Sequence, residues 1–258
     1  MGEGLSRGIG GVQAVLFDCG ATLIEPDPPV DVQFVRVAAQ RGHNVPLEQV
    51  HPYMEVIDRY YDMLYMKDSS FWASQERSVD MWYDIYRFLS HLTGLADDAE
   101  GMARDLFAAY LKPDSWKVYG DVVPTLQRLK DAGCRLAVVS NWDPSLPGLL
   151  DGLGLAGFFD ALEVSALAGA RKPEPQIFER ALRDLGVAAN ACVHVGDKVD
   201  ADGDGAASAG IRAVIIDRAG QLAASQAACP YPVIGTLAAL PAVLERSVRP
   251  DAGTADRE

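Results

Sequence analysis

Three short apolar runs that end in polar residues constrain the fold of this chain more than any other feature of its sequence. Residues 12–17 are mostly apolar and stop at Asp18. Residues 135–139 and 192–195 have the same character, and polar residues follow them directly as well. Runs of this length and composition are typical of strands buried inside a parallel sheet. We therefore expect three parallel strands with polar groups at their carboxyl ends.

From residue 113 onward, amphipathic stretches alternate with apolar runs. Each of three helical stretches is followed by an apolar run: 125–132 by 135–139, 176–185 by 192–195, and 206–209 by 212–216. This alternation predicts an α/β fold with a doubly wound parallel sheet that helices cover on both faces. Ligands of such sheets bind in the crevice outside the carboxyl ends of the strands. We expect the polar residues that follow the strands to converge there: Asp18, Ser140, Asn141, Gly196 and Asp197.

Residues 26–112 follow a different pattern, with few glycines and long amphipathic stretches. These stretches are residues 31–41, 47–66, 75–93 and 98–111. Their apolar spacing predicts a smaller all-helical domain of about four helices. We therefore predict an α/β core from residues 9–25 and 113–240 and a helical cap from residues 26–112. The polar ends, residues 1–8 and 247–258, are expected to be disordered.

The composition limits the partners of the chain. Its 258 residues, 49% of them hydrophobic, suffice for one large core and a small second domain. A formal net charge of −13 opposes non-specific binding to nucleic acid or to an anionic membrane surface, so an anionic substrate needs a local positive site. The four cysteines are far apart and no stretch is apolar enough to cross a bilayer, so we expect reduced thiols in a cytoplasmic protein. No pattern in the sequence indicates the oligomeric state.

The polar positions of the core follow one another in a set order: Asp18 and Thr22, then Ser140, then Lys172 before a proline, and then Asp197 and Asp202. Each alone is a weak signal, because an aspartate before a glycine often only caps a turn. In this order they resemble the four motifs of the haloacid dehalogenase (HAD) superfamily of hydrolases, over about residues 12–218. From residue 119 onward, SNWDP, RKPEPQIF and HVGDKVDAD look much like the subgroup that includes haloacid dehalogenase-like hydrolase domain-containing protein 3.

This resemblance implies a Mg²⁺-dependent phosphatase that acts on a small phosphorylated molecule. Asp18 would be the nucleophile and would form an aspartyl-phosphate. The Asp18 carboxylate, the Gly20 carbonyl and the Asp197 carboxylate would hold the metal, with Asp202 as a further ligand or a supporting partner. Three carboxylates that converge without a cation would repel one another, which is a physical reason to expect the metal.

The remaining matched positions would bind the phosphoryl group or orient the nucleophile. Lys172 would balance the negative charge, and Ser140 would hold phosphoryl oxygens. Thr22 would orient the nucleophile or bind a phosphoryl oxygen, unless it only caps a turn. Asn141 and Trp142 follow Ser140 directly and are expected to contact the substrate.

One position departs from the superfamily pattern. Phosphatases of the superfamily usually carry a second aspartate two residues after the nucleophile, which protonates the leaving group, and this chain has Gly20 there. General acid–base catalysis is typically worth about 10²–10⁴ in rate. Its loss should therefore matter most for alkyl phosphates, whose leaving groups need a proton.

Three explanations of this departure stay open. Glu25, Asp27, Lys67, Asp68 or an ordered water could supply the proton, or the substrate could have a good leaving group. The chemistry could also differ, as carbon–phosphorus hydrolysis with Lys67 as a Schiff base or as carbon–halogen hydrolysis without metal, although the Asp197 and Asp202 pair argues against the latter. A binding protein with little turnover is a further alternative. The insert is rich in aromatic residues, and some of these could bind a ring-bearing substrate opposite Trp142.

Overall fold

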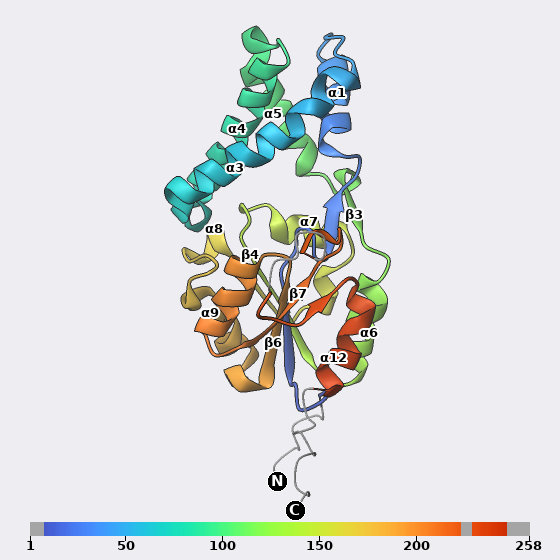
Figure 1. The fold of residues 1–258 in the computed structure, drawn as a ribbon, viewed down its shortest axis with the longest axis vertical. Coiled ribbons are helices and arrows are strands. Elements are labelled where there is room, and N and C mark those ends of the chain that lie inside the picture. The colour runs from blue at the N-terminus through green and yellow to red at the C-terminus, as the bar shows by residue number, and fades with distance from the viewer. Residues whose placement is uncertain (1–7, 223–228, 247–258) are drawn as a thin grey trace, which may run out of the picture.

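The computed structural model describes residues 8–222 and 229–246. Figure 1 shows the helices α1 to α5 at one end of the molecule and a sheet with its surrounding helices at the other. The predicted disorder of residues 1–8 and 247–258 lies, apart from Gly8, outside the described residues. No described helix is long and apolar enough to span a bilayer.

The sheet has six parallel strands in the order β5-β4-β1-β6-β7-β8. The strands are β1 (Ala14–Phe17), β4 (Arg135–Ser140), β5 (Ala161–Val164), β6 (Cys192–Gly196), β7 (Arg212–Ile216) and β8 (Val233–Ile234). From β1 the chain first builds outward through β4 to β5, and it then returns to the other side of β1 to build β6, β7 and β8. The predicted doubly wound α/β fold is therefore confirmed. Its switch point lies at β1, between β4 and β6.

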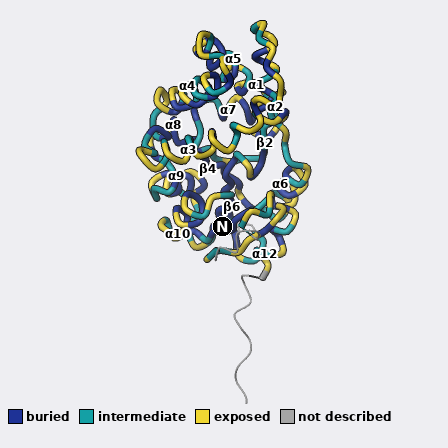
Figure 2. Tube along the Cα trace, turned by 45° about the horizontal axis from the view of Figure 1, so that its top comes forward, coloured by how far each residue is buried: buried dark blue, intermediate teal, exposed yellow. Residues whose placement is uncertain are grey.

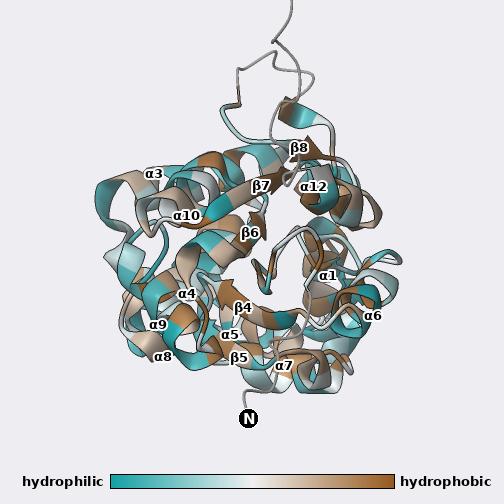
Figure 3. Ribbon diagram, turned by 90° about the horizontal axis from the view of Figure 1, so that it is seen from below, coloured by the Kyte–Doolittle hydropathy of each residue, from teal (hydrophilic) through white to brown (hydrophobic). Residues whose placement is uncertain are grey.

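Helices cover both faces of the sheet. Because side chains along each strand alternate in direction, alternate residues pack against the helices of each face. Val15 and Phe17 belong to a buried cluster with leucines of α6 (Val122–Asp131), α7 (Leu146–Gly152) and α12 (Leu240–Arg246). Ala14 and Leu16 belong to a second buried cluster with α9 (Pro175–Leu185) and α10 (Gly205–Ser208). Figure 3 shows the apolar strands enclosed by these helices, and Figure 2 shows the buried residues gathered along the strands.

The helices before residue 112 form a third buried cluster of their own. They are α1 (Val30–Gln40), α2 (Leu47–Val50), α3 (Met54–Asp68), α4 (Gln75–Leu92) and α5 (Ala99–Tyr110). The stretch expected as one helix over 47–66 is two helices, joined by a 3₁₀ turn at His51–Tyr53. Pro52 in this turn has no backbone N–H to donate, so it removes a helical hydrogen bond and interrupts the helix there. The predicted boundaries of the cap at residues 26 and 112 stay a prediction.

A short antiparallel pair of strands, β2 (Ile24–Pro26) and β3 (Trp116–Val118), joins the cap helices to the sheet. Neither strand was predicted, because three residues are too few to show an alternating pattern. The pair brings together the two segments in which the chain leaves the sheet for the cap and returns from it. It also places Trp116 between the cap helices and the sheet, where its ring lies 5.7 Å from Tyr110 and 5.1 Å from Trp142.

Candidate active site

The predicted polar residues meet at the carboxyl ends of β1, β4 and β6. Asp18 follows β1, Ser140 ends β4, and Asp197 follows β6. Lys172 lies in the loop between α8 (Ser165–Ala168) and α9, and Asp202 lies in a π-helical turn at Val199–Asp204. All five line one crevice of about 390 Å³.

The centre of this crevice is a buried cluster of charges. Lys172 Nζ donates to Asp18 Oδ1 over 2.7 Å and to Asp202 Oδ1 over 2.5 Å, and only 2% of Lys172 is exposed. Ser140 Oγ donates to the same Asp18 oxygen over 2.8 Å. Burial opposes the charge on Lys172, but the two carboxylates outweigh it and raise the pKa of the lysine above its ordinary value. The lysine is therefore a permanent positive charge in an acidic site.

Asp202 has both carboxylate oxygens engaged by the protein. Its Oδ1 lies 2.9 Å from His194 Nε2, and its Oδ2 accepts from the backbone N–H of Lys198 over 2.9 Å. Burial acts against the charge on Asp202, but Lys172 and His194 hold its pKa well below the usual range. These contacts suit a carboxylate that orients Lys172 better than one that is free to bind a metal.

Three carboxylates in the crevice could share a cation. One oxygen each from Asp18, Asp197 and Asp202 lie within 4.8 Å of one another. Burial, together with the charges of Asp18 and Asp202, raises the pKa of Asp197 to about 7. A bound divalent cation would relieve this repulsion, and oxygen ligands are those that Mg²⁺ prefers. The residues present therefore fit a magnesium ion.

Gly20 lines the crevice with Trp142 packed against it. A Cβ atom at Gly20 would lie 3.2 Å from Cζ3 of the Trp142 ring and would meet no other heavy atom within 4 Å. The backbone angle φ of Gly20 is not in the positive region that favours glycine. The ring of Trp142 therefore occupies the space beside the position from which the usual second aspartate would extend.

Asn141 makes its side-chain contacts with the lysine loop. Its Nδ2 donates to the Lys172 carbonyl over 3.0 Å, and its Oδ1 accepts from the Lys172 backbone N–H over 2.8 Å. The amide thus ties β4 to the loop that carries the buried lysine. These contacts support a positioning role, and the expected contact of Asn141 with substrate stays a prediction.

Thr22 is fully buried and does not line the crevice. Its hydroxyl has no hydrogen-bond partner among the described residues, and its carbonyl accepts from Arg218 over 2.7 Å. The expected role in orienting Asp18 therefore has no supporting contact in this structure.

The named proton donors do not reach the crevice. Glu25 pairs with Lys117 over 3.2 Å, and Asp68 pairs with Arg77 over 2.7 Å. Lys67 and Asp68 line a separate surface hollow, and Asp27 is absent from the crevice lining. This placement gives no support to Lys67 as a Schiff base.

The sequence alone did not single out several residues that line or support the crevice, although some cap aromatics were expected there. Helix α3 contributes Tyr61, Asp62 and Tyr65, and the π-helical turn contributes Asp200. No sequence signal identifies the α3 residues, because their direction depends on how the cap lies over the sheet. His194 had a signal: a histidine in the middle of an apolar strand is expected to need a polar partner.

The fold and the site together define a class of protein. A doubly wound sheet that carries a carboxylate, a buried lysine and an acidic pair at its switch point, beneath helices, is the framework of a capped α/β hydrolase. The family model described as haloacid dehalogenase-like hydrolase matches residues 12–210. The chain belongs to this family of hydrolases, and the predicted family is confirmed.

Individual relatives agree with this assignment. Haloacid dehalogenase-like hydrolase domain-containing protein 3 of Danio rerio is 30% identical over 243 residues, which are 92% of this chain and 98% of that protein. Glyceraldehyde 3-phosphate phosphatase of Methanopyrus kandleri is 40% identical over 116 residues, 43% of this chain and 46% of that protein.

Solved structures show the same fold. A HAD phosphatase from Thermococcus onnurineus is 27% identical with a TM-score of 0.61, and the match covers 90% of this chain and 98% of that one. A 2-haloacid dehalogenase from Pseudomonas syringae pv. Tomato is also 27% identical, with a TM-score of 0.60 over 92% of this chain and 99% of that one. Similarity of this degree does not separate phosphatase from dehalogenase, so the site residues must decide.

Proposed function

We propose that the protein is a Mg²⁺-dependent phosphatase that hydrolyses small organic phosphate monoesters through an aspartyl-phosphate on Asp18. The observation that carries the proposal is the buried contact of Lys172 with both Asp18 and Asp202, beside the acidic cluster with Asp197. A dehalogenase that works without metal has no use for the Asp197 carboxylate beside Asp18 and Asp202. Relatives with phosphatase names add support.

Asp18 is oriented for attack by its two hydrogen bonds. Oδ1 accepts from Ser140 and Lys172, while no hydrogen bond from the described residues reaches Oδ2. Oδ2 would attack phosphorus, the bond from phosphorus to the leaving oxygen would break, and that oxygen would take up a proton. Water would then cleave the aspartyl-phosphate and release inorganic phosphate.

The charge balance of the crevice supports a metal requirement. Among the residues that line it, five are carboxylates (Asp18, Asp62, Asp197, Asp200, Asp202) and two are lysines (Lys172, Lys198). Such a site would repel a phosphate dianion unless a cation reduced the excess negative charge. The Asp18 and Asp197 carboxylates and the Gly20 carbonyl would hold Mg²⁺, with Asp202 mainly supporting Lys172. The bound ion would offset the negative charge that develops in the transition state.

Asp62 takes the place of the missing acid in this proposal. It is the carboxylate that the cap contributes to the crevice, on a helix that lies over the site. The proton would pass from Asp62 to the leaving oxygen directly or through one water.

The free thiols of all four cysteines further support a cytoplasmic location.

The test is phosphate release from a panel of aryl and alkyl phosphates, with and without Mg²⁺. We expect Mg²⁺-dependent turnover that Asp18→Asn abolishes. If no ester releases phosphate and the Asp18→Asn protein still binds phosphate and Mg²⁺ as the parent does, a binding role would replace the proposal. Release of halide from a 2-haloacid without metal would instead support carbon–halogen hydrolysis.

A further inference from the structure

A second cavity lies between the cap helices and the sheet, next to the catalytic crevice. Its volume is about 520 Å³. Tyr61 and Trp142 line both the cavity and the crevice, whereas Asp18 and Lys172 line only the crevice. A phosphate ester held at Asp18 could therefore extend its organic part past these two rings into the cavity.

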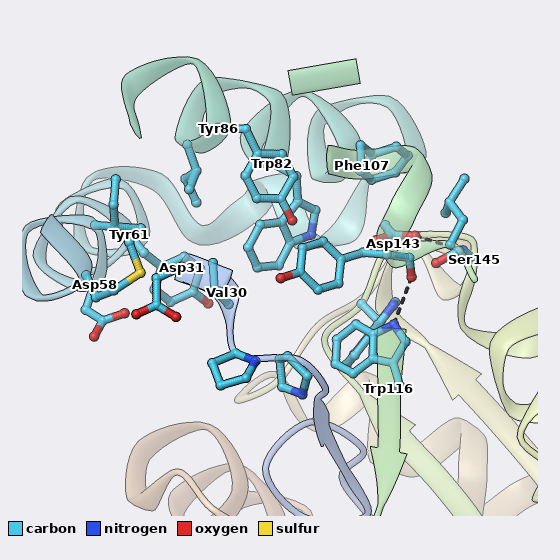
Figure 4. Close-up of a pocket in the computed structure, with 18 of the residues that line it drawn as sticks. Val30, Asp31, Asp58, Tyr61, Trp82, Tyr86, Phe107, Trp116, Asp143 and Ser145 are labelled. Atoms are coloured by element: carbon cyan, nitrogen blue, oxygen red, sulfur yellow. Dashed lines mark hydrogen bonds between the residues drawn. The ribbon is translucent and has the colours of Figure 1, made fainter. Parts of the chain in front are cut away.

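The wall of this cavity contains a continuous series of aromatic rings (Figure 4). Neighbouring centroids lie 6.0 Å apart for Trp82 and Tyr86, 6.1 Å for Tyr86 and Tyr110, 5.7 Å for Tyr110 and Trp116, and 5.1 Å for Trp116 and Trp142. Rings that only filled the interior of the cap would leave no space of this size between them. The faces of such rings attract cations as well as apolar groups.

The charges around the cavity are negative. Asp31, Asp58 and Asp143 line it, and no lysine or arginine of the described residues does. Figure 4 shows Asp31 and Asp58 on one side of the cavity and Asp143 on the other. The basic residue in the lining is His51, whose Nδ1 already lies 2.6 Å from Asp31.

Of the three carboxylates, Asp143 is the one whose negative charge is least balanced by neighbouring groups. It is 5% exposed, and its Oδ1 accepts from the backbone N–H of Ser145 over 2.9 Å. Burial raises the pKa of Asp143, and no cationic side chain within the described part of the chain lowers it. Since a buried carboxylate without a cation is costly, this position favours a positively charged ligand.

The Tyr110 hydroxyl also points to a ligand. Tyr110 lines the cavity and is 9% exposed, and its buried hydroxyl has no hydrogen-bond partner among the residues described. Buried polar groups of proteins nearly always have a partner. A polar group of a bound ligand would supply one.

We propose that this cavity binds the leaving group of the substrate and selects an apolar organic cation, such as a quaternary ammonium group. The inference rests on the proposed phosphatase function and specifies its substrate class. The aromatic faces would contact the alkyl groups of the cation, and the carboxylate of Asp143 would balance its charge. A leaving group with a second anionic group would be excluded.

The cavity is tested first without catalysis. Choline and its uncharged carbon isostere 3,3-dimethylbutan-1-ol are titrated into the full chain, with binding followed by calorimetry and tryptophan fluorescence. We expect choline to bind about tenfold more tightly, or about 1.4 kcal/mol, because the carboxylate of Asp143 balances its charge beside the aromatic faces. Asp143→Asn should remove most of this preference and leave the alcohol affinity unchanged. Asp97→Asn, which removes the same charge from an exposed position on the cap, should change neither.

Turnover separates the two proposals. The phosphate esters of the same two alcohols are offered to the parent protein, and we expect the choline ester to have the higher kcat/KM. Equal binding of choline and its isostere, or a preference that survives Asp143→Asn, would overturn the cavity proposal whatever the turnover. Selective binding of choline with no phosphate released from any ester would instead refute the phosphatase and leave the cation site standing.

Discussion

Gly20 and Trp142 are coupled positions, because a side chain at residue 20 would contact the indole ring at 3.2 Å. Because Asp62 supplies the acid in our proposal, Gly20→Asp is tested in the Asp62→Asn protein, where we expect it to increase kcat on an alkyl phosphate about tenfold. This gain is below the usual 10²–10⁴ range because the ring must shift. An aryl phosphate, whose leaving group needs little protonation, should change less than about twofold. Steady-state kinetics on the matched pair of esters measures both effects.

The control for this substitution is Gly20→Ala. It adds the same Cβ against Trp142 without an acid, so it should not increase kcat on either ester. An equal gain on both esters with Gly20→Asp would show that protonation of the leaving group does not limit the reaction.

Asp62 offers a second prediction for a single residue. If this carboxylate supplies the proton, Asp62→Asn should reduce kcat on alkyl phosphates by about 10²-fold or more while aryl phosphates are nearly unaffected. The difference between the two esters is measured by the same assay, and KM should stay similar. A parallel loss on both esters would mean that Asp62 shapes the crevice without transferring a proton.

The end of β6 and the π-helical turn after it depend on a close approach at Gly196. A Cβ atom there would lie 2.1–2.5 Å from the Asp202 carboxylate, so Gly196→Ala must displace Asp202 from Lys172. Breaking a buried ion pair costs about 3–5 kcal/mol, and we expect a loss of stability of this order in urea unfolding.

Gly148→Ala in α7 is the matched control, since a Cβ there meets nothing within 4 Å. It should leave stability unchanged or raise it by up to about 1 kcal/mol. Similar losses for both variants would contradict the close-approach argument.

Arg41, at the end of α1, is joined to α5 by ion pairs. It donates to Asp98 and Asp105, and His43 also contacts Asp98, so the pKa of Asp98 is held well below its usual range. Because the folded pKa is below the unfolded one, this stabilisation is present at neutral pH and declines once the pH falls below about 3.9. The difference in Tm between the parent and Asp98→Asn should therefore shrink below that pH and vanish in stronger acid. A difference that is constant from pH 7 to pH 3 would exclude an ionic origin.

At the scale of the molecule, a bound cation should stabilise the sheet because the three carboxylates come from segments far apart in the chain. At a Mg²⁺ concentration of about 100 times Kd, the expected gain in unfolding free energy is about 2.7 kcal/mol. Calorimetric Tm measurements with Mg²⁺, and with NaCl at equal ionic strength, would show it. Asp197→Asn should lose most of the gain, and an unchanged gain would place the metal elsewhere.

The local pattern of the chain was sufficient to predict the inner sheet and the centre of the site. The buried runs that become β1, β4 and β6 end in polar residues, and parallel strands bring such ends together whatever their distance in sequence. Asp18, Ser140, Lys172, Asp197 and Asp202 therefore meet in the crevice as expected. The edge strands β5 and β8 were not predicted, because short strands at an edge carry too little of the apolar pattern.

The tertiary structure alone decided what surrounds this centre. Which face of α3 points at the crevice depends on how the cap lies over the sheet. The sequence therefore could not favour Asp62 over Glu25, Asp27 or Asp68 as the acid at the crevice. The aromatic residues of the cap look alike in sequence whether they pack or line a cavity. Only the tertiary structure shows that Trp142 lies between the crevice and the second cavity. Chemistry that follows strand ends is local and can be predicted, whereas the substrate pocket forms between two packed units and depends on their orientation.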